Sequence, residues 1–383
     1  MPWAILNGMS GLAIALSLTL HQSPLTFDLS TDKSRQVVVD REPGQYLGHV
    51  TTVLLEDGKT ILCTYPKGHG KGAIVMKRSH DGGLTWTDRL DLPTSYETSL
   101  EVPTIYRTIE PVTGKKRLIL WSGLYPARTS VSEDDGATWS ELKTVGDWGG
   151  IVVMASQIQL KDGKYEAFFH DDGRFWKNAG AATGTFTLYE CESSDGGVSW
   201  SYPHAIWSGS DVQLCEPGAV RSPDGRTLAL LLRENKRVKQ SHVMFSTDEA
   251  KTWTTPRELP VSLTGDRHTA AYLPDGRLVV CFRDMAATSS TKGDFVAWIG
   301  TFRDILEGTP GQYRVRLLDN TGGSDCGYPG VEVLPDGTVV ATTYGHWIDG
   351  QPPYIVSVRF KVDEIDQLAK SKRSNNFFGD RID

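Results

Sequence analysis

The sequence predicts an all-β protein, a six-bladed β-propeller built from four-stranded antiparallel blades. Three features of the 383 residues indicate this fold: an octapeptide that occurs four times, six hairpin turns at similar intervals, and little helical periodicity before residue 362. Units that recur at intervals of roughly 50 residues are typical of propellers, in which each unit forms one blade. We name the strands of a blade A to D, outward from the axis.

The octapeptide follows the pattern S-x-D-x-G-x-[TS]-W and starts at Ser79, Ser132, Ser193 and Ser246. In the fourth copy Ala250 replaces the glycine. The aspartate can accept hydrogen bonds from turn amides, the glycine can adopt a positive φ, and the tryptophan can bury a large face against the sheet. We therefore interpret the octapeptide as the turn between strands C and D, rather than as a ligand site.

Hairpin turns separate the predicted A and B strands. Thr113-Gly114 supplies one turn, and Asp-Gly pairs, a strong hairpin signal between apolar runs, supply the other five. These pairs start at Asp57, Asp162, Asp224, Asp275 and Asp336. Because adjacent strands alternate in direction, both kinds of turn should lie at one end of the propeller.

The last blade is predicted to close the ring with a strand from the start of the chain. Tyr354–Phe360 has the pattern of its C strand, and the strand-like run 36–39 is left over for its outer position. We expect the propeller domain to span residues 34–363. The polar tail 371–383 is expected to lack regular structure.

Composition and charge exclude several classes of function. The 40 Lys and Arg against 47 Asp and Glu give a net charge of −7, which argues against nucleic acid as a partner. No run of 18 apolar residues follows the N-terminus, so no membrane span is expected in the mature chain. The five cysteines are scattered and form no C-x-x-C pair, so neither a disulfide framework nor a metal site is indicated, and no cofactor is expected.

Residues 11–20 form a short apolar run that suits the central stretch of a secretory signal. We therefore expect residues 1–21 to be a signal peptide and the protein to be secreted or periplasmic. The alternative is a start codon assigned upstream of a cytoplasmic enzyme.

The end opposite the two series of turns holds the B–C loops and the starts of the A strands, and it concentrates charged, His and Tyr residues. Polar groups that converge from several loops of a rigid scaffold predict a site. Arginine forks match carboxylates in bidentate geometry, so we expect a carboxylate-bearing ligand. The arginines in question are Arg174, Arg233, Arg267 and Arg283.

With four Asp-containing boxes, six repeats and this polar rim, the chain resembles the sialidase (neuraminidase) superfamily, as a divergent bacterial-type branch. The resemblance implies a Tyr nucleophile paired with a Glu, and three arginines on the substrate carboxylate. Glu216 and Arg233 match the Glu partner and the second arginine in order, and Tyr328 matches the nucleophile. Arg283 or Arg267 matches the third arginine.

Two positions depart from the family pattern. The first A strand reads Leu47-Gly48-His49-Val50 where the family carries R-I-P, and the first B–C loop holds Lys67, His69 and Lys71 but no acid. The acid/base that the resemblance implies is an aspartate in this loop. His69 can replace it, because histidine titrates near neutral pH. Asp171 or Asp172 from another blade can do so as well, and Arg174 can replace the missing arginine. Further substrate-binding candidates are His49, His268 and Asp284.

We therefore predict a retaining exo-glycosidase that removes a terminal acidic sugar from sialylated or other acidic glycans, with sialic acid as the preferred candidate. A carboxylate nucleophile would be repelled by the carboxylate on the anomeric carbon of sialic acid, whereas a neutral phenol activated by Glu216 would not. Two alternatives remain: a hydrolase or lyase for another acidic sugar, such as a uronic or ketodeoxy acid, and a carbohydrate-binding propeller without catalysis.

Overall fold

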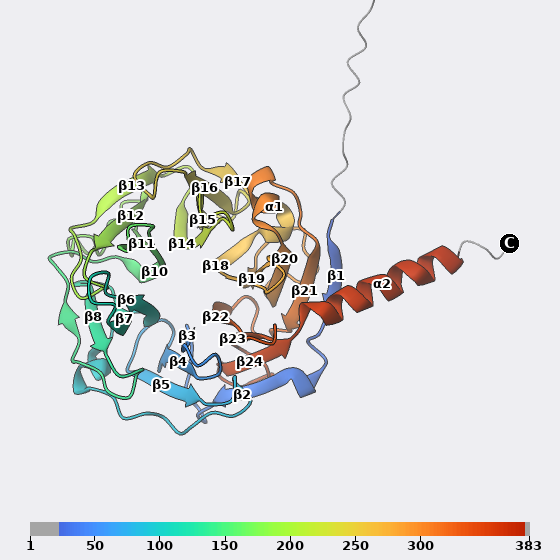
Figure 1. The fold of residues 1–383 in the computed structure, drawn as a ribbon, viewed down its shortest axis with the longest axis horizontal. Coiled ribbons are helices and arrows are strands. Elements are labelled where there is room, and N and C mark those ends of the chain that lie inside the picture. Colours follow the sequence, from blue (N-terminus) through green and yellow to red (C-terminus); the bar gives the residue numbers. More distant parts are fainter. Residues whose placement is uncertain (1–22, 380–383) are drawn as a thin grey trace, which may run out of the picture.

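The computed structural model describes residues 23–379, which form a ring of six β-sheets around a central axis (Figure 1). The prediction of an all-β six-bladed propeller is therefore confirmed. The expected signal peptide, residues 1–21, lies outside the described residues and stays a prediction. None of the described helices is long and apolar enough to span a membrane.

The blades follow one another along the chain, with strand A innermost. Blade 1 comprises β3 (Thr51–Leu54), β4 (Ile61–Pro66) and β5 (Ile74–Ser79). Blade 2 comprises β6 (Thr104–Ile109), β7 (Lys116–Ser122), β8 (Arg128–Ser132) and β9 (Lys143–Thr144). Blade 3 comprises β10 (Ile151–Gln159), β11 (Tyr165–Asp171), β12 (Phe186–Ser193) and β13 (His204–Gly209).

The other three blades complete the ring. Blade 4 comprises β14 (Leu214–Arg221), β15 (Leu228–Glu234), β16 (His242–Ser246) and β17 (Arg257–Glu258). Blade 5 comprises β18 (Gly265–Tyr272), β19 (Leu278–Asp284), β20 (Phe295–Gly300) and β21 (Tyr313–Leu318). Blade 6 comprises β22 (Cys326–Val333), β23 (Val339–Gly345), β24 (Tyr354–Phe360) and β2 (Gln36–Asp40).

Blade 1 has three regular strands, and an extended segment takes the place of its D strand. The amides of Thr87 and Leu90 in this segment donate to the β5 carbonyls of Arg78 and Met76, at 2.8 and 2.9 Å. The segment follows the first octapeptide directly, as the D strands of other blades follow theirs. The prediction of a blade with four chain segments thus holds here too, in a less regular form.

The octapeptide has the structural role that its sequence predicts. In the first copy, Asp81 Oδ1 accepts hydrogen bonds from the amides of Leu84 and Thr85, and Ser79 Oγ accepts one from Gly83. The amide of Gly82 donates to the carbonyl of Lys59, in the turn between β3 and β4, at 2.8 Å. The two kinds of turn therefore lie at the same end of the blade, which leaves the other end for the B–C loops.

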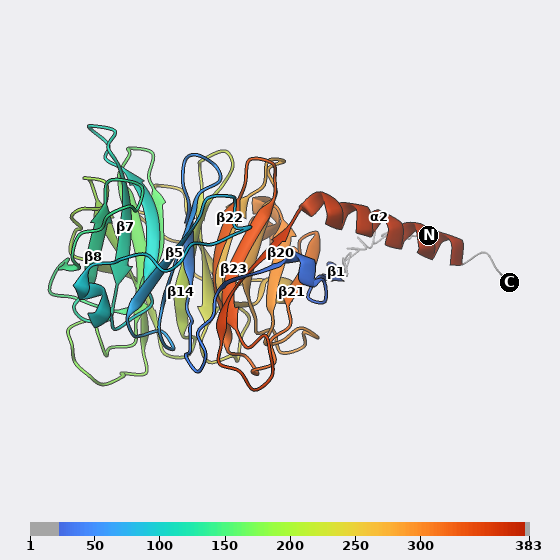
Figure 2. The same cartoon turned by 90° about the horizontal axis from the view of Figure 1, so that it is seen from below.

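The chain ends differ from the prediction in part. As expected, β2 pairs antiparallel with β24 and closes blade 6. However, β1 (Leu25–Asp28) adds a parallel strand to β21, so the fold begins before residue 34. The helix α2 (Val362–Gly379) extends away from the propeller (Figure 2), so the tail is helical up to residue 379, where irregular structure was expected.

Short helical turns fill the connections. The 3₁₀ turns are η1 (Lys33–Arg35), η2 (Thr94–Thr98) and η3 (Val261–Leu263), and α1 (Phe302–Glu307) follows β20. Large apolar side chains from neighbouring sheets pack between the blades, among them the fully buried Trp121, Trp148 and Trp298. This packing fixes the blades around the axis and makes the end with the B–C loops a rigid platform.

Candidate functional site

The inner strands share a backbone irregularity at the end opposite the octapeptide turns. Register shifts interrupt the ladders of β10, β14, β18 and β22 with their B strands. Four residues at these shifts, and one just before β3, adopt almost the same positive φ, between 51° and 56°. They are His49, Val152, Glu216, Arg267 and Tyr328. A bulge re-aims a side chain, and positive φ costs about 1–3 kcal/mol per residue, a strain that clusters at functional sites.

Two of these residues meet across the axis. Tyr328 Oη donates a hydrogen bond to Glu216 Oε1 at 2.5 Å, and Arg233 Nη1 donates to the same oxygen at 2.6 Å. Tyr328 is 8% and Glu216 2% exposed. The other carboxylate oxygen, Glu216 Oε2, is buried and accepts no hydrogen bond from the described residues. The contact between Tyr328 and Glu216 expected from sequence is therefore present.

The electrostatics of this pair keep the proton on the phenol and the negative charge on the carboxylate. Burial raises the pKa of Glu216, but the Arg233 guanidinium more than offsets this, so that its pKa lies below the ordinary value. Burial, and then the charge of Glu216, raise the pKa of Tyr328. At neutral pH the pair is thus an ionised carboxylate and a neutral phenol, the states required of a general base and its proton donor.

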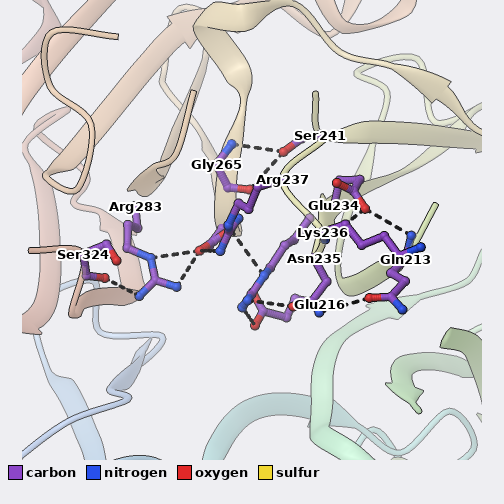
Figure 3. A network of polar contacts seen from close by, with 12 residues as sticks. Gln213, Glu216, Glu234, Asn235, Lys236, Arg237, Ser241, Gly265, Arg283 and Ser324 are labelled. Atoms are coloured by element: carbon purple, nitrogen blue, oxygen red, sulfur yellow. Dashed lines mark hydrogen bonds and ion pairs between the residues drawn. The ribbon is translucent and has the colours of Figure 1, made fainter. Parts of the chain in front are cut away.

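A buried carboxylate, Asp266, gathers three arginines beside this pair. Figure 3 shows Arg237 and Arg283 of this network together with Glu216. Arg283 Nε and Nη2 donate to its Oδ2 at 2.9 and 2.5 Å, and Arg237 binds both oxygens. Arg233 Nε lies 3.4 Å from Oδ1. Burial opposes ionisation of Asp266, but the three guanidinium groups hold its pKa well below the ordinary range.

The charges of this cluster leave room for one more anionic group. Three guanidinium groups face two carboxylates, those of Asp266 and Glu216, which gives a net charge of +1. Asp266 holds Arg233 and Arg283 in fixed positions, which reduces the entropy lost when a ligand is bound. The expectation that Arg233 and Arg283 lie together is met, and a ligand carboxylate would complete the charge balance.

Arg267 lies beneath the ring of Tyr328. Its guanidinium carbon is 5.8 Å from the centroid of that ring, and Nη1 donates to the carbonyl of Ala155. Arg267 is 4% exposed, and no described carboxylate forms an ion pair with it. It also lines a cavity of 170 Å³ formed by the inner strands. Arg267 therefore adds a further positive charge directly under the phenol.

Aromatic and imidazole rings surround Tyr328 on the side of blade 1. His49 replaces the expected family arginine, and its ring centroid lies 4.2 Å from Tyr328, 4.6 Å from His69 and 4.8 Å from Tyr344. Burial lowers the pKa of His49 well below its usual range, so the ring is neutral. Of the predicted candidates, His49 thus contacts Tyr328, and His69 lies on the other side of His49.

Glu101, at the start of the blade 2 inner strand, is a further buried carboxyl group at this end. Its two oxygens accept hydrogen bonds from the amides of Val102 and Val152, at 3.1 and 3.0 Å. Burial raises its pKa to about 7, although these amides lower it. The negative charge of Glu216 also raises this pKa, so the two carboxyl groups interact.

Three candidates from blade 3 bind one another or the backbone. Asp171 accepts hydrogen bonds from the amides of Gly173, Phe175 and Trp176, so it fixes the β11–β12 loop. Asp172 binds Arg174 Nε at 2.9 Å. Both aspartates are buried, whereas Arg174 is 44% exposed. A structural role in this loop accounts for both aspartates, and neither contacts Tyr328 or Glu216.

Two blade 5 candidates are held away from the Tyr328–Glu216 pair. His268 Nε2 contacts the carbonyl of Leu263 at 3.0 Å, and its ring packs against Phe282. Asp284 is fully buried and pairs with Arg314 at 2.6 Å. These contacts occupy both side chains within their own blade, so the expectation that they bind substrate finds no support in the geometry.

Sequence reasoning missed several residues of the cluster. Asp266 and Asp325 stand at the starts of A strands, but a lone acid there does not reveal how many partners it binds. Arg237 lies in the loop after β15, only four residues beyond Arg233, and that proximity was the available signal. Tyr46 precedes the first inner strand and gave no signal. No group of three potential metal ligands occurs among the described residues.

Several solved structures share this fold. A protein of unknown function from Dyadobacter fermentans has a TM-score of 0.66 and 17% identity over 85% of this chain and 97% of its own. A Hadza microbial sialidase has a TM-score of 0.59 and 18% identity, over 83% of this chain and 66% of its own. An intramolecular trans-sialidase from Ruminococcus gnavus has a TM-score of 0.57 and 14% identity, over 83% of this chain and 95% of its own.

These identities are low, and the likeness to these structures concerns the fold. No curated protein sequence matches the chain. The family model described as BNR repeat-like domain matches residues 29–227, slightly more than half of the sequence. This match includes three of the four octapeptides, and the propeller is the one that the sialidases share. The chain therefore belongs to the family of BNR repeat-like domains, and it shares its propeller fold with the sialidases.

Proposed function

We propose that the protein is a retaining exo-glycosidase that hydrolyses a terminal acidic sugar, with sialic acid as its substrate. The observation that carries the proposal is the 2.5 Å hydrogen bond from Tyr328 Oη to Glu216 Oε1. This bond joins a neutral phenol and an ionised carboxylate at the mouth of the propeller, which is the end that carries the B–C loops. Kinship with sialidases supports the same chemistry.

In this proposal Tyr328 is the nucleophile and Glu216 the base. The phenolic oxygen attacks the anomeric carbon while its proton passes to Glu216, and the bond to the leaving oxygen breaks. Water then attacks the same carbon, the bond to Tyr328 breaks, and Glu216 returns the proton to Tyr328. The proton that the water loses balances the one that the leaving oxygen takes up. A neutral phenol suits a sugar whose anomeric carbon carries a carboxylate, because it is not repelled by that charge.

The arginine cluster would hold the sugar carboxylate. Arg233 and Arg283 are pinned by Asp266, and the cluster has a net positive charge that one carboxylate would neutralise. A guanidinium group binds a carboxylate through two parallel hydrogen bonds, which gives orientation as well as affinity. The phenol would then face the carbon that bears this carboxylate.

The proposal is tested with 4-methylumbelliferyl α-N-acetylneuraminide and the variant Tyr328→Phe. We expect kcat to fall by at least about 10³-fold, as when other enzymes lose their nucleophile. Tyr65→Phe is the matched control, because Tyr65 is also buried but donates its hydrogen bond to Asp40, at 2.5 Å, and not to Glu216. Unchanged activity of Tyr328→Phe would refute the role of the tyrosine, and tight binding of the sialoside without turnover would favour a binding propeller.

A second candidate function is cleavage of a different acidic sugar, a uronic or ketodeoxy acid. The observation that favours it is His49, which stands at the family's first arginine and contacts the Tyr328 ring. With one arginine fewer to bind the substrate carboxylate, the site can accept a sugar whose carboxylate is placed differently on its ring. A panel of acidic glycans separates the two, and mass spectrometry identifies a lyase by its unsaturated product.

A further inference from the structure

A tight loop presents His69 at the mouth of the propeller. The loop joins β4 to β5 and is closed by the amide of Lys67, which donates to the carbonyl of Ala73 at 2.9 Å. Gly68 and Gly72 have positive φ, and a Cβ at either would lie within 2.4 Å of a loop carbonyl oxygen. The glycines therefore allow a compact loop whose tip exposes 66% of the His69 side chain.

Two residues from elsewhere in the ring hold the His69 imidazole. Tyr46 Oη lies 2.6 Å from Nδ1, and Asp325 Oδ1 lies 3.5 Å from it. Tyr46 Oη donates its only proton to Asp325, whose oxygens are 2.8 and 3.0 Å away. The oxygen of Tyr46 can therefore only accept from His69, so Nδ1 carries a proton and Nε2 is the atom left for a ligand.

The contacts of Asp325 keep its carboxylate ionised. Besides Tyr46, it accepts a hydrogen bond from Tyr344 Oη at 3.2 Å and contacts His346 Nε2 at 3.1 Å. Burial raises its pKa, but the contacts with His69, Tyr46 and His346 more than compensate and hold the pKa below the ordinary range. An ionised Asp325 behind Tyr46 stabilises a positive charge on His69.

His69 is also close to the proposed nucleophile. Its ring lies 4.6 Å from that of His49, whose ring lies 4.2 Å from that of Tyr328. Tyr46, Asp325 and His49 are the titratable groups that contact the imidazole, and the charge of Arg283 acts on the neighbouring His49. Asp171 and Asp172 are bound within the β11–β12 loop, whereas His69 is linked to Tyr328 through the ring of His49.

We propose that His69 is the general acid of the reaction and that Asp325, acting through Tyr46, is its positioning residue. The inference rests on the proposed glycosidase function. It places an imidazole in the loop where the sialidase pattern has an aspartate.

The proton balance of the reaction is complete with these groups. In the first step the glycosidic bond breaks, the bond from Tyr328 to the anomeric carbon forms, the phenol proton passes to Glu216, and His69 Nε2 gives its proton to the leaving oxygen. In the second step Nε2 takes a proton from water, the water oxygen bonds to the anomeric carbon, and Tyr328 leaves and recovers its proton from Glu216. Each group ends in its starting state.

The test compares two leaving groups on the wild-type protein and on His69→Gln. A sugar alcohol needs protonation to leave, whereas the phenol of a 4-methylumbelliferyl sialoside leaves without it. We expect His69→Gln to lose about 10²–10⁴-fold in kcat/KM on 3′-sialyllactose, and less than about 10-fold on the aryl sialoside. Asp325→Asn and Tyr46→Phe should lose about 10–100-fold on 3′-sialyllactose with the same selectivity.

His204→Gln is the matched control, because His204 is also 66% exposed and pairs with a carboxylate, that of Glu190, at 2.9 Å on an outer strand. Tyr46→Phe keeps the test decisive if His69→Gln fails to fold, which thermal unfolding reveals. Equal losses on both substrates, or no loss on either, would overturn the role of His69 but would not bear on the proposed glycosidase function. A folded wild-type protein that cleaves neither substrate would overturn the proposed function, and this inference with it.

Discussion

Replacing Asp266 by Asn tests whether the arginine cluster depends on one buried charge. The Asp266 side chain is 1% exposed, and the side chains of Arg233, Arg237 and Arg283 around it are 18%, 30% and 11% exposed. In Asp266→Asn the three guanidinium groups lose their shared counter-charge and repel one another. Glu216 alone remains, and it contacts only Arg233 among them.

The size of the effect follows from this burial. Removing one partner of a buried ion pair costs about 3–5 kcal/mol. An unfolding entropy of about 2.1 cal/mol/K per residue gives about 0.8 kcal/mol/K for 383 residues. The melting temperature of Asp266→Asn should therefore fall by about 4–6 °C at neutral pH.

Thermal unfolding followed by circular dichroism measures this shift, with Glu307→Gln as control. Glu307 forms an ion pair with Arg303, but the two side chains are 47% and 80% exposed, so its loss should cost less than about 1 kcal/mol. Because the folded-state pKa of Asp266 is lowered, its stabilisation is present above the ordinary value of 3.8 and is lost as the pH falls below it. A shift no larger than that of Glu307→Gln at pH 7 would refute the reasoning.

Two further predictions concern stability. Gly136→Ala should lower the urea midpoint of unfolding more than Gly114→Ala. Both glycines have positive φ, but a Cβ at 136 would lie 2.5 Å from Leu62 Cδ1, whereas one at 114 would meet nothing within 4 Å. Equal midpoints for the two variants would contradict this prediction. Burial, and then Glu190, raise the pKa of Glu166 to about 9, so its folded form loses stability as the pH rises from about 4.5 to about 9. Glu166→Gln should gain melting temperature over the wild type at pH 8.5 but not at pH 4, and a gap independent of pH would contradict this.

The blades were predictable because their signals are local. An Asp-Gly pair or an octapeptide specifies its own turn, and the turns divide the chain into strands; the C strand predicted for the last blade, Tyr354–Phe360, coincides with β24. The outer strand contributed by the start of the chain followed from the need to pair the last edge. The parallel β1 and the helix over 371–379 were missed, because β1 depends on its pairing with β21 and because residues 371–379 continue a helix that begins at Val362.

The site was less predictable, because side-chain direction depends on the bulges. A regular inner strand would point Asp266 and His268 to one face and Arg267 to the other. The register shift between Asp266 and Thr269, with positive φ at Arg267, changes this order. Asp266 then meets the arginines and His268 turns to Leu263. Sequence spacing alone does not reveal this shift, so Arg267 and His268 stood as candidates and Asp266 did not.

The repeated bulge also explains how one scaffold carries such chemistry. His49, Glu216, Arg267 and Tyr328 have φ values within 5° of one another, so their blades present side chains from the same backbone geometry. Glycine would adopt this conformation without strain, yet each position carries a large polar side chain. The strain is therefore retained for what these side chains do together at the axis.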